Sequence, residues 1–314
     1  MALQTFFSGG SIDRLAELRN DPQTLQNLWN DPATRFLAAW ESRFLVRDDA
    51  VLLLTREDIR QLDSIEEYIY LGRLDDRHIF GLDLKESPEK HGIDQALFEN
   101  FRGLMGNLAA DEAALLAYAK GMIEWRNRHR YCGVCGAANR PESGGFVMAC
   151  TGNECDGRTF PRIDPAIIVL VIHEGRCLLG RQKNWPAGRY STVAGFAEPG
   201  ESLEDAVCRE VKEETNIAIG EIEYLGSQPW PFPTAMMVGF HATATSTDIR
   251  LNDEELADAR WFSRTDLQRG EIMLPPTTSI AFRLIEDWFN RTGGPKLESL
   301  NLSGSFSRTT GERT

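Results

Sequence analysis

The sequence lacks the features that define several classes of protein. No stretch approaches the roughly 18 apolar residues of a membrane-spanning helix, and the longest apolar run, Ala166 to Ile172, has seven residues. The amino-terminal segment has no basic region before an apolar core, so we expect no signal or transit peptide and a cytoplasmic protein. Neither a Gly-x-Gly-x-x-Gly turn after a strand nor a phosphate-loop Gly-Lys-Ser/Thr occurs, which argues against a Rossmann site with a redox nucleotide.

Basic residues and histidines are also scarce. The 34 Lys and Arg residues are outnumbered by 47 Asp and Glu residues, and the net charge is −13. Such a surface repels phosphate backbones, so we do not expect bulk non-specific binding of nucleic acid. A small anionic substrate is compatible with this charge if a bound cation supplies positive charge locally. The five histidines form no ligand pattern.

The length indicates more than one domain. At roughly 150 residues per domain, 314 residues correspond to about two domains and a small module. We predict an N-terminal domain at 1–128, a cysteine-rich module at 129–160, an α/β domain at 161–292 and a flexible tail at 293–314. The tail is predicted to be mobile because it is rich in Gly, Ser, Thr and Arg.

Apolar periodicity predicts the main helices and strands. In the first part we expect a turn at 30–33 that leads into a helix, a β-hairpin at 65–84 that turns near Asp75-Asp76, and a helix at 111–128. In the α/β domain the predicted strands are Ala166–Ile172, Cys177–Arg181, Ala235–Thr245 and Ala259–Phe262. The predicted helices there are Leu203–Thr215 and Ser279–Asn290.

Four of the six cysteines form two close pairs within 24 positions, Cys132-x2-Cys135 and Cys150-x4-Cys155. Two such pairs on two turns are typical of a zinc ribbon, in which four thiolates close a tetrahedral Zn²⁺ site. Four thiols without a metal are the alternative. A catalytic zinc is disfavoured because it would need an open position and His or carboxylate ligands. Cys177 and Cys208 are expected to be buried or half-buried packing residues.

The helix predicted at Leu203–Thr215 carries three carboxylates on one face. Glu210, Glu213 and Glu214 are related by i, i+3 and i+4, a spacing at which like charges destabilise a helix. Divalent Mg²⁺ or Mn²⁺ would relieve this repulsion, because these cations prefer oxygen ligands. A solvated acidic face is the alternative on these three residues alone. Ser202 is predicted to cap the helix with Asp205 as its reciprocal partner.

The wider segment resembles the Nudix box. The matching positions are Gly195, Glu201, Arg209, Glu210, Val211, Glu213, Glu214 and Ile217, and the departure is Asn216, where the pattern has Gly. Asn is the next best residue for a left-handed position after a helix. The resemblance implies an α/β/α sandwich with a mixed sheet that hydrolyses a nucleoside diphosphate linked to another moiety. It also implies that the three glutamates bind Mg²⁺ or Mn²⁺ and that Arg209 orients them.

A second motif resembles the signature of the NADH pyrophosphatase (NAD diphosphatase) subfamily. Residues 227–233 read SQPWPFP and continue with Thr234-Ala235, where the signature usually has x-Ser. The subfamily also carries a four-cysteine zinc site before its Nudix domain. The segment from Tyr70 to Asp76 resembles its amino-terminal domain, a degenerate Nudix-like module.

The subfamily resemblance implies the residues that bind substrate. Phe196 and Phe160 match aromatics that sandwich the substrate base, and Phe160 is expected to act from the neighbouring subunit of a homodimer. Core packing is the alternative for both rings. Met237 matches a position on the nicotinamide side. Glu255 matches a fourth metal-binding carboxylate, with Glu254 as its competitor and an exposed loop as the alternative.

These motifs together predict a metal-dependent hydrolase of the pyrophosphate bond in NADH or NAD⁺, which yields NMNH or NMN and AMP. Whether Glu255 or Glu214 activates the water is left open. One alternative is removal of NAD caps from RNA 5′ ends at the same site, helped by a basic strip of Arg126, Arg128, Arg130 and Arg140. The other is a non-enzymatic zinc-ribbon regulator that binds nucleotides.

Overall fold

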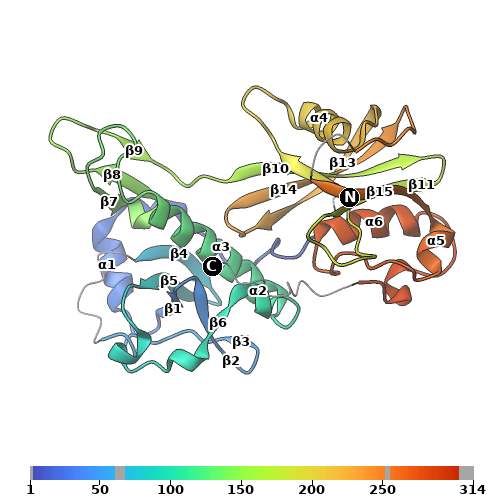
Figure 1. The fold of residues 1–314 in the computed structure, drawn as a ribbon. Coiled ribbons are helices and arrows are strands. Elements are labelled where there is room, and N and C mark those ends of the chain that lie inside the picture. Colours follow the sequence, from blue (N-terminus) through green and yellow to red (C-terminus); the bar gives the residue numbers. More distant parts are fainter. Residues whose placement is uncertain (1–2, 61–67, 252–254, 304–314) are drawn as a thin grey trace. The chain divides into compact units, whose positions relative to one another are not determined.

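The computed structural model describes residues 3–60, 68–251 and 255–303, and the chain divides into two compact units (Figure 1). The N-terminal unit consists of Phe7–Ile163 and Trp230–Thr234, and the C-terminal unit of Met1–Phe6, Asp164–Pro229 and Ala235–Thr314. The cysteine-rich module is therefore part of the N-terminal unit, whereas residues 3–6 belong to the C-terminal unit.

The C-terminal unit is built on one mixed sheet. Its strand order is β13-β14-β10-β11-β15, and β12 pairs with β10. The central strand β10 is parallel to β14 and antiparallel to β11 and β12. The strands are β10 (Asp164–His173), β11 (Arg176–Gln182), β12 (Val193–Phe196), β13 (Ile219–Trp230), β14 (Ala235–Ala244) and β15 (Leu256–Ser263).

Strand β10 is buried on both faces, which explains its unbroken apolar run. Ile167 and Val169 pack on one face with helix α4 (Leu203–Thr215). Ile168 packs on the other face with helix α6 (Ile280–Asn290). Because neighbouring residues of a strand point to opposite faces, the two helices cover opposite sides of the sheet (Figure 1). The predicted α/β/α sandwich with a mixed sheet is confirmed.

The segment after α6 packs onto the C-terminal unit as far as it is described. Leu297 begins a 3-10 turn, η5 (Leu297–Leu300), and is fully buried in the same apolar cluster as α6. The backbone N–H of Leu274 donates to the carbonyl of Leu302 at 2.8 Å. A flexible tail was expected from residue 293, but these two leucines instead complete the core; residues 304–314 lie outside the described part.

The N-terminal unit contains a second mixed sheet, with strand order β3-β2-β1-β5-β4 and β6 paired to β2. Strand β1 is parallel to β5, and β4 is antiparallel to it. The strands are β1 (Arg35–Trp40), β2 (Arg43–Arg47), β3 (Ala50–Val51), β4 (Ile69–Leu74), β5 (Arg77–Leu84) and β6 (Phe98–Asn100).

The turn at 30–33 was predicted to lead into a helix, and this prediction was wrong. Helix α1 (Pro22–Asn30) ends at the turn, and strand β1 begins after it. The missed signal lies before the helix, where the Asp21 side chain accepts from the backbone N–H of Thr24 and Pro22 occupies the first helical position.

The predicted hairpin is confirmed by β4 and β5. Asp75 and Asp76 form its turn with φ angles of 47° and 61°, and two residues of positive φ are what the two-residue turn of a twisted hairpin requires. The start of the prediction, residues 65–67, lies outside the described residues.

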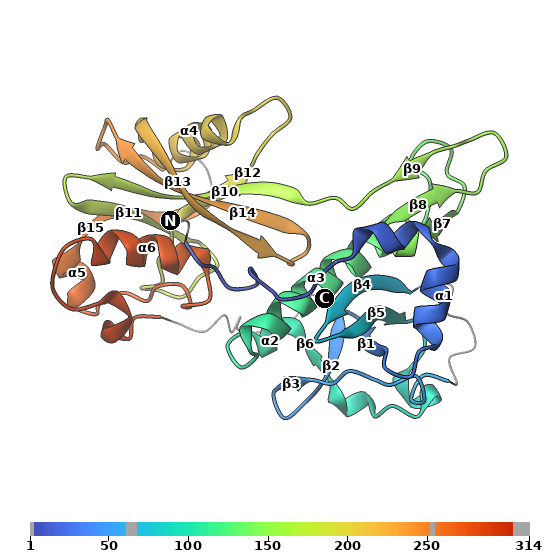
Figure 2. The same cartoon turned by 180° about the vertical axis from the view of Figure 1, so that it is seen from behind.

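The predicted helix at 111–128 corresponds to α3 (Ala110–Arg128). After it come three strands that form a small sheet of their own, drawn in green in Figure 2. They are β7 (Asn139–Glu142), β8 (Val147–Cys150) and β9 (Arg158–Thr159). The short α-helices are α2 (Phe101–Leu104) and α5 (Arg264–Gln268). Within the described ranges, every helix is too short or too polar to span a membrane.

Candidate active site

The glutamate-rich segment folds as the end of β12, a loop and helix α4. The Ser202 hydroxyl accepts from the backbone N–H of Asp205 at 3.1 Å, and the Asp205 carboxylate accepts from the Ser202 backbone N–H at 3.0 Å. The predicted capping box is therefore present. The helix ends at Asn216, whose φ of 64° is left-handed. Asparagine visits this conformation more readily than most residues, so the departure from Gly leaves the helix end intact.

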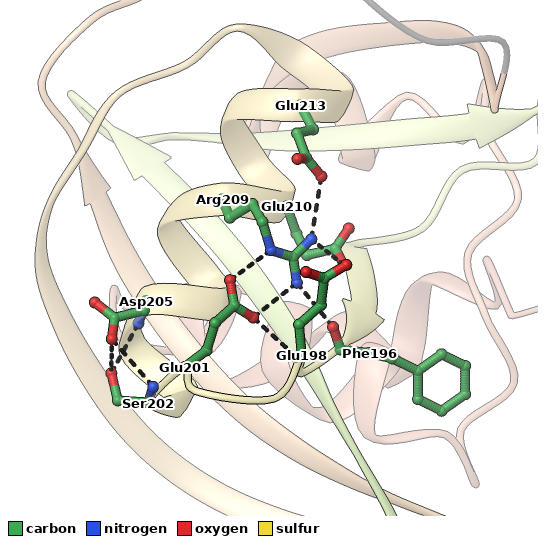
Figure 3. Close-up of polar contacts among 8 residues, drawn as sticks. All are labelled: Phe196, Glu198, Glu201, Ser202, Asp205, Arg209, Glu210 and Glu213. Carbon is green, nitrogen blue, oxygen red and sulfur yellow. Dashed lines mark hydrogen bonds and ion pairs between the residues drawn. The ribbon is translucent and has the colours of Figure 1, made fainter.

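Arg209 is the centre of a hydrogen-bond network beside α4 (Figure 3). It donates two bonds to the Glu201 carboxylate, from Nε at 2.6 Å and from Nη2 at 3.0 Å. Its Nη1 donates to Glu210 at 2.9 Å and to Glu213 at 3.1 Å, and Nη2 donates to the carbonyl of Phe196 at 2.8 Å. A planar guanidinium with five donors can hold all these acceptors at once. The bonds, with Glu201 foremost, raise the pKa of Arg209 above its usual range.

Glu201 belongs to the matched motif, but sequence reasoning assigned it no role. The hydrogen bonds from Arg209 lower the pKa of its carboxyl group. Its Oε2 also accepts from the backbone N–H of Glu198 at 2.9 Å, which closes the loop before α4. Glu201 thus anchors the arginine from outside the helix. Only the fixed spacing of the motif could have indicated this role, because no helical periodicity links residues 201 and 209.

Gly195 allows the strand and the helix to approach each other. A Cβ atom at this position would overlap the carboxyl group of Glu210. The backbone of Gly195 needs no unusual φ, so the glycine is required here for space and not for conformation.

The carboxylates of α4 differ in exposure. The side chain of Glu213 is 56% exposed, and that of Glu210 is only 14% exposed. Burial raises the pKa of Glu210, Arg209 opposes this effect, and the charges of Glu213 and Glu255 raise the pKa further. Glu255 is therefore near enough to act electrostatically on Glu210, although it comes from a different segment. Glu254, its predicted competitor, lies outside the described residues.

The arrangement concentrates negative charge within one turn of helix. Glu214 is buried, with 4% of its surface exposed, and follows the half-exposed Glu213 in sequence. The Glu210 carboxyl is partly desolvated, and Arg209 alone does not restore its usual pKa. A hard divalent cation with oxygen ligands fits such a cluster, because it supplies the missing positive charge.

The four clustered cysteines converge in the N-terminal unit. Their sulfur atoms all lie within 4.8 Å of one another. The Sγ atoms of Cys132 and Cys155 are 3.8 Å apart, and those of Cys135 and Cys150 are 3.3 Å apart. Four sulfurs at about 2.3 Å from a tetrahedral zinc would be separated by about 3.8 Å. The set therefore fits a four-coordinate zinc ion.

Comparisons with known proteins match all three parts of the chain. The matching family models are the NUDIX domain at residues 162–287, the NADH pyrophosphatase-like rudimentary NUDIX domain at 33–125 and the NADH pyrophosphatase zinc ribbon domain at 127–160. A human relative named NAD-capped RNA hydrolase NUDT12 is 40% identical, over 91% of this chain and 73% of its own length. The chain belongs to the Nudix family, in its NADH pyrophosphatase-like branch.

Two further proteins resemble this Nudix chain. The NAD-capped RNA hydrolase NudC of Pseudomonas fluorescens (strain Pf0-1) is 39% identical, over 79% of this chain and 87% of its own length. Among solved structures, a NUDIX hydrolase from Nitrosomonas europaea aligns with 52% of this chain and 89% of its own, at 24% identity and a TM-score of 0.41.

The predicted base-binding residues of this Nudix protein come from both units. Phe196 and Met237 flank Ala166 in the sheet, since Ala166 pairs with both across β12 and β14. Cα partners point to the same face, so Phe196 and Met237 share the face opposite α4. The Phe196 ring is 58% exposed and points away from the glutamates (Figure 3). Phe160 belongs to the N-terminal unit and is 52% exposed.

The SQPWPFP motif has a structural role in each unit. Gln228 is fully buried in the C-terminal unit, where Nε2 donates to the carbonyls of Phe6 at 3.1 Å and Thr278 at 2.8 Å. Its Oε1 accepts from the backbone N–H of Ile280 at 2.8 Å, in the first turn of α6.

The second half of the motif packs among aromatic residues of the N-terminal unit. The Phe232 ring lies 5.2 Å from that of Trp230 and 5.7 Å from that of Phe101. The guanidinium of Arg102 lies over the Phe232 ring at 4.1 Å.

The two remaining cysteines differ in burial. Cys177 is fully buried in the α6 cluster, which confirms the predicted packing role. Cys208 is exposed on α4, so the prediction of a buried or half-buried residue was wrong. Position 208 follows the buried Val207 and lies one step outside the stripe that faces the sheet.

Proposed function

We propose that this Nudix protein hydrolyses the pyrophosphate bond of NADH or NAD⁺ and releases NMNH or NMN and AMP. The observation that carries the proposal is the cluster of glutamates held around Arg209 on α4. The NADH pyrophosphatase-like rudimentary domain and zinc ribbon support the choice of substrate within the family.

We also propose that Glu210, Glu213, Glu214 and Glu255 bind Mg²⁺ or Mn²⁺, which carboxylate oxygens suit. Divalent metal at such a site stabilises charge on phosphoryl oxygens and makes a bound water more acidic. Arg209 holds two of these carboxylates in place, and Glu201 in turn holds Arg209. Glu214 and Glu255 are the candidates for the group that takes the proton from the attacking water.

Phe196 and Phe160 are proposed to hold a base of the substrate, with Met237 on the nicotinamide side. Phe196 and Phe160 are both exposed, which supports this role, because stacking a base on an aromatic side chain contributes about 1–3 kcal/mol. We propose a homodimer in which Phe160 completes the site of the partner. Mixing Phe160→Ala and Glu213→Gln proteins, each of which has low activity by itself, should then restore part of the activity, and no recovery in a mixed dimer would contradict the shared site.

The cysteine cluster is proposed to hold a structural Zn²⁺, since it has four thiols and leaves no position for substrate. All six cysteines lack disulfide bonds, which is usual in a reducing compartment. We therefore propose a cytoplasmic location.

Removal of NAD caps from RNA 5′ ends is a second candidate activity. The relatives from human and Pseudomonas fluorescens are both named NAD-capped RNA hydrolases. The same carboxylate cluster would serve the hydrolysis of the same pyrophosphate bond, that of the NAD cap. The net charge of −13 disfavours contacts along a long RNA backbone.

A product assay tests the proposed function. Purified protein with Mg²⁺ or Mn²⁺ is offered NADH, NAD⁺ and ADP-ribose, and the products are separated and identified. We expect AMP and NMNH from NADH, lost in Glu213→Gln and retained in Glu204→Gln, which removes an exposed charge from the first turn of the same helix. If Glu213→Gln remained active, the carboxylate cluster would not be the site.

NAD-capped RNA serves as a parallel substrate in the same assay. Salt-dependent turnover of capped RNA, with little turnover of free NADH, would favour the second candidate. No turnover of any dinucleotide or capped RNA would favour the non-enzymatic alternative.

A further inference from the structure

A cavity of about 220 Å³ lies within the N-terminal unit, where the rudimentary Nudix part meets the zinc ribbon. Its walls are the end of β5 with Lys85, the last turn of α3 with the residues after it, and strands β7 and β8. The carboxylate cluster of the proposed active site belongs to the other unit. The cavity therefore needs an explanation of its own.

Cationic side chains dominate the walls of this cavity. Lys85, Arg126 and Arg130 line it together with a single carboxylate, that of Asp83. Asp83 Oδ2 accepts from Lys85 Nζ at 2.5 Å and from Asn127 Nδ2 at 2.7 Å. Three cations against one carboxylate leave an excess of positive charge, although the chain as a whole is strongly acidic. The cavity thus attracts an anion.

The cations are held in fixed positions. Arg126 is buried, and its Nη1 donates to the carbonyl of Tyr68 at 3.0 Å. Asn127 Oδ1 accepts from Lys85 Nζ at 3.0 Å and from Arg130 Nη2 at 2.7 Å. One amide oxygen therefore draws two of the cationic groups to the same point, which is the arrangement that a multivalent anion such as a phosphate needs.

One buried acceptor at the cavity is left without a donor in the part of the chain that the structure describes. Asn139 Nδ2 donates to the carbonyl of His129 at 3.0 Å, and this bond fixes the orientation of the amide. Asn139 Oδ1 is buried and has no donor among the described residues. A ligand hydroxyl satisfies such an oxygen.

An aromatic ring stands at the mouth of the cavity. Tyr131 lines the cavity, yet 70% of its surface is exposed. An exposed ring beside cationic groups is the usual platform for a nucleic-acid base, because every base has a face that stacks.

We propose that this cavity binds a nucleoside monophosphate, with the phosphate near Lys85 and Arg130, a ribose hydroxyl on Asn139 and the base against Tyr131. On this measure a single water needs about 10–15 Å³, so a cavity of about 220 Å³ has room for a ribose phosphate. The site goes beyond the proposed hydrolysis and is independent of the glutamates of α4.

Equilibrium dialysis of the full chain against AMP tests the proposal. The measurement uses the Glu213→Gln protein without added divalent metal, so that the proposed active site contributes little. Tyr131→Ala should weaken AMP binding at least about fivefold, and Arg130→Gln about tenfold. Tyr131→Phe keeps the ring and should bind like the parent. Arg128→Gln, a matched control that removes the same charge from a residue outside the cavity, should stay within about twofold.

Further ligands define the chemistry of the site. Adenosine and inorganic phosphate should each bind far more weakly than AMP, because each lacks half of the contacts. Displacement of AMP by a 5′-phosphorylated RNA oligomer, lost in Tyr131→Ala, would support the site and assign its nucleotide to the end of an RNA chain. AMP binding that is absent, or that is unchanged in both Tyr131→Ala and Arg130→Gln, would overturn the proposal.

Discussion

Gly195 on strand β12 and Glu210 on helix α4 lie directly against each other. Glu210 is the least exposed of the three acidic groups that contact Arg209, and its carboxyl group occupies the space beside the Gly195 Cα. The position of this carboxylate therefore depends on the absence of a side chain at Gly195 as much as on Arg209.

Replacement of Gly195 by Ala should displace the Glu210 carboxylate. We expect hydrolysis to fall roughly 10- to 100-fold, as is typical when a group that orients a metal ligand is disturbed. Gly121→Ala is the control: it lies inside α3, and an added Cβ would contact nothing there. This control should keep full activity and gain about 0.4–1 kcal/mol in the free energy of unfolding. Equal activity of the two variants would contradict the steric argument.

For single residues, the sequence indicates which side chains belong to the site better than it indicates the contacts that they make. The helical spacing of Glu210 and Glu213 was sufficient to place them on one face, and the motif indicated that Arg209 orients them. The anchoring bonds from Glu201, and the buried amide of Gln228, depend on loop and strand positions that no periodicity encodes. Cys208 was predicted to be buried or half-buried but is exposed. It lies at the edge of the apolar stripe of α4, where the periodicity does not decide between the buried and the exposed face.

The elements around the site are fixed mainly at their ends. Helix α4 begins with a capping box and ends with a left-handed residue, so both of its termini are specified by local sequence. Asn216 adds two bonds of its own, since its side chain accepts from Lys212 at 2.8 Å and donates to the carbonyl of Asp248 at 3.3 Å.

Substitution of Asn216 should distinguish backbone conformation from side-chain bonding. Asn216→Ala keeps a Cβ in the left-handed region, which costs about 1–2 kcal/mol, and also loses both bonds. Asn216→Gly relieves the strain and should cost less than Asn216→Ala. Urea unfolding of the two variants measures the difference, and a more stable Ala variant would show that φ at this position is not limiting.

The elements of the C-terminal unit were predictable because their signals are local. Strand β10 is a continuous apolar run, and α4 and α6 each carry a clear apolar stripe. In the N-terminal unit, the sequence did not predict α1, because the turn at 30–33 was interpreted as the start of a helix and is in fact the end of α1. The packing of residues 297–302 was missed because two leucines in a Gly- and Ser-rich segment give no periodic signal.

For the molecule as a whole, the proposed zinc site and the sandwich are separate sources of stability. The four thiols belong to the N-terminal unit, whereas the apolar layers around β10 belong to the other. Folding free energy drawn from a metal is lost when the metal is removed.

Chelation should therefore destabilise one unit selectively. We expect a strong zinc chelator to lower the melting temperature of the N-terminal unit by at least about 5 °C and to leave that of the C-terminal unit unchanged. Cys135→Ser should mimic the chelator, and Cys208→Ser, an exposed position outside the cluster, should not. Equal shifts of both transitions would mean that the metal does not act through the ribbon.

His241 should make stability depend on pH. It is buried between β14 and α6, where Nε2 lies 2.9 Å from the carbonyl of Leu284, and burial lowers its pKa. The unfolded chain then binds a proton more readily than the folded one, so this contribution to stability is lost as the pH falls below about 6.5. His241→Gln keeps a donor for Leu284.

Thermal unfolding of wild type and His241→Gln at about pH 7.5 and about pH 5.5 measures this effect. The decrease in melting temperature between the two pH values should be smaller in the variant. His91→Gln, in the N-terminal unit, serves as the control and should follow the wild type. An unchanged decrease in His241→Gln would exclude this histidine as the cause.

Residues 3–6 belong to the C-terminal unit, although the 157 residues of Phe7–Ile163 in the other unit follow them. The backbone N–H of Leu3 donates to the carbonyl of Leu225 at 2.7 Å, and the Thr5 hydroxyl donates to the carbonyl of Ser227 at 2.6 Å. During synthesis, this segment leaves the ribosome before its partners exist. The N-terminal unit can fold in the meantime, but the hydrolase domain closes only when residues made before that unit meet residues made after it.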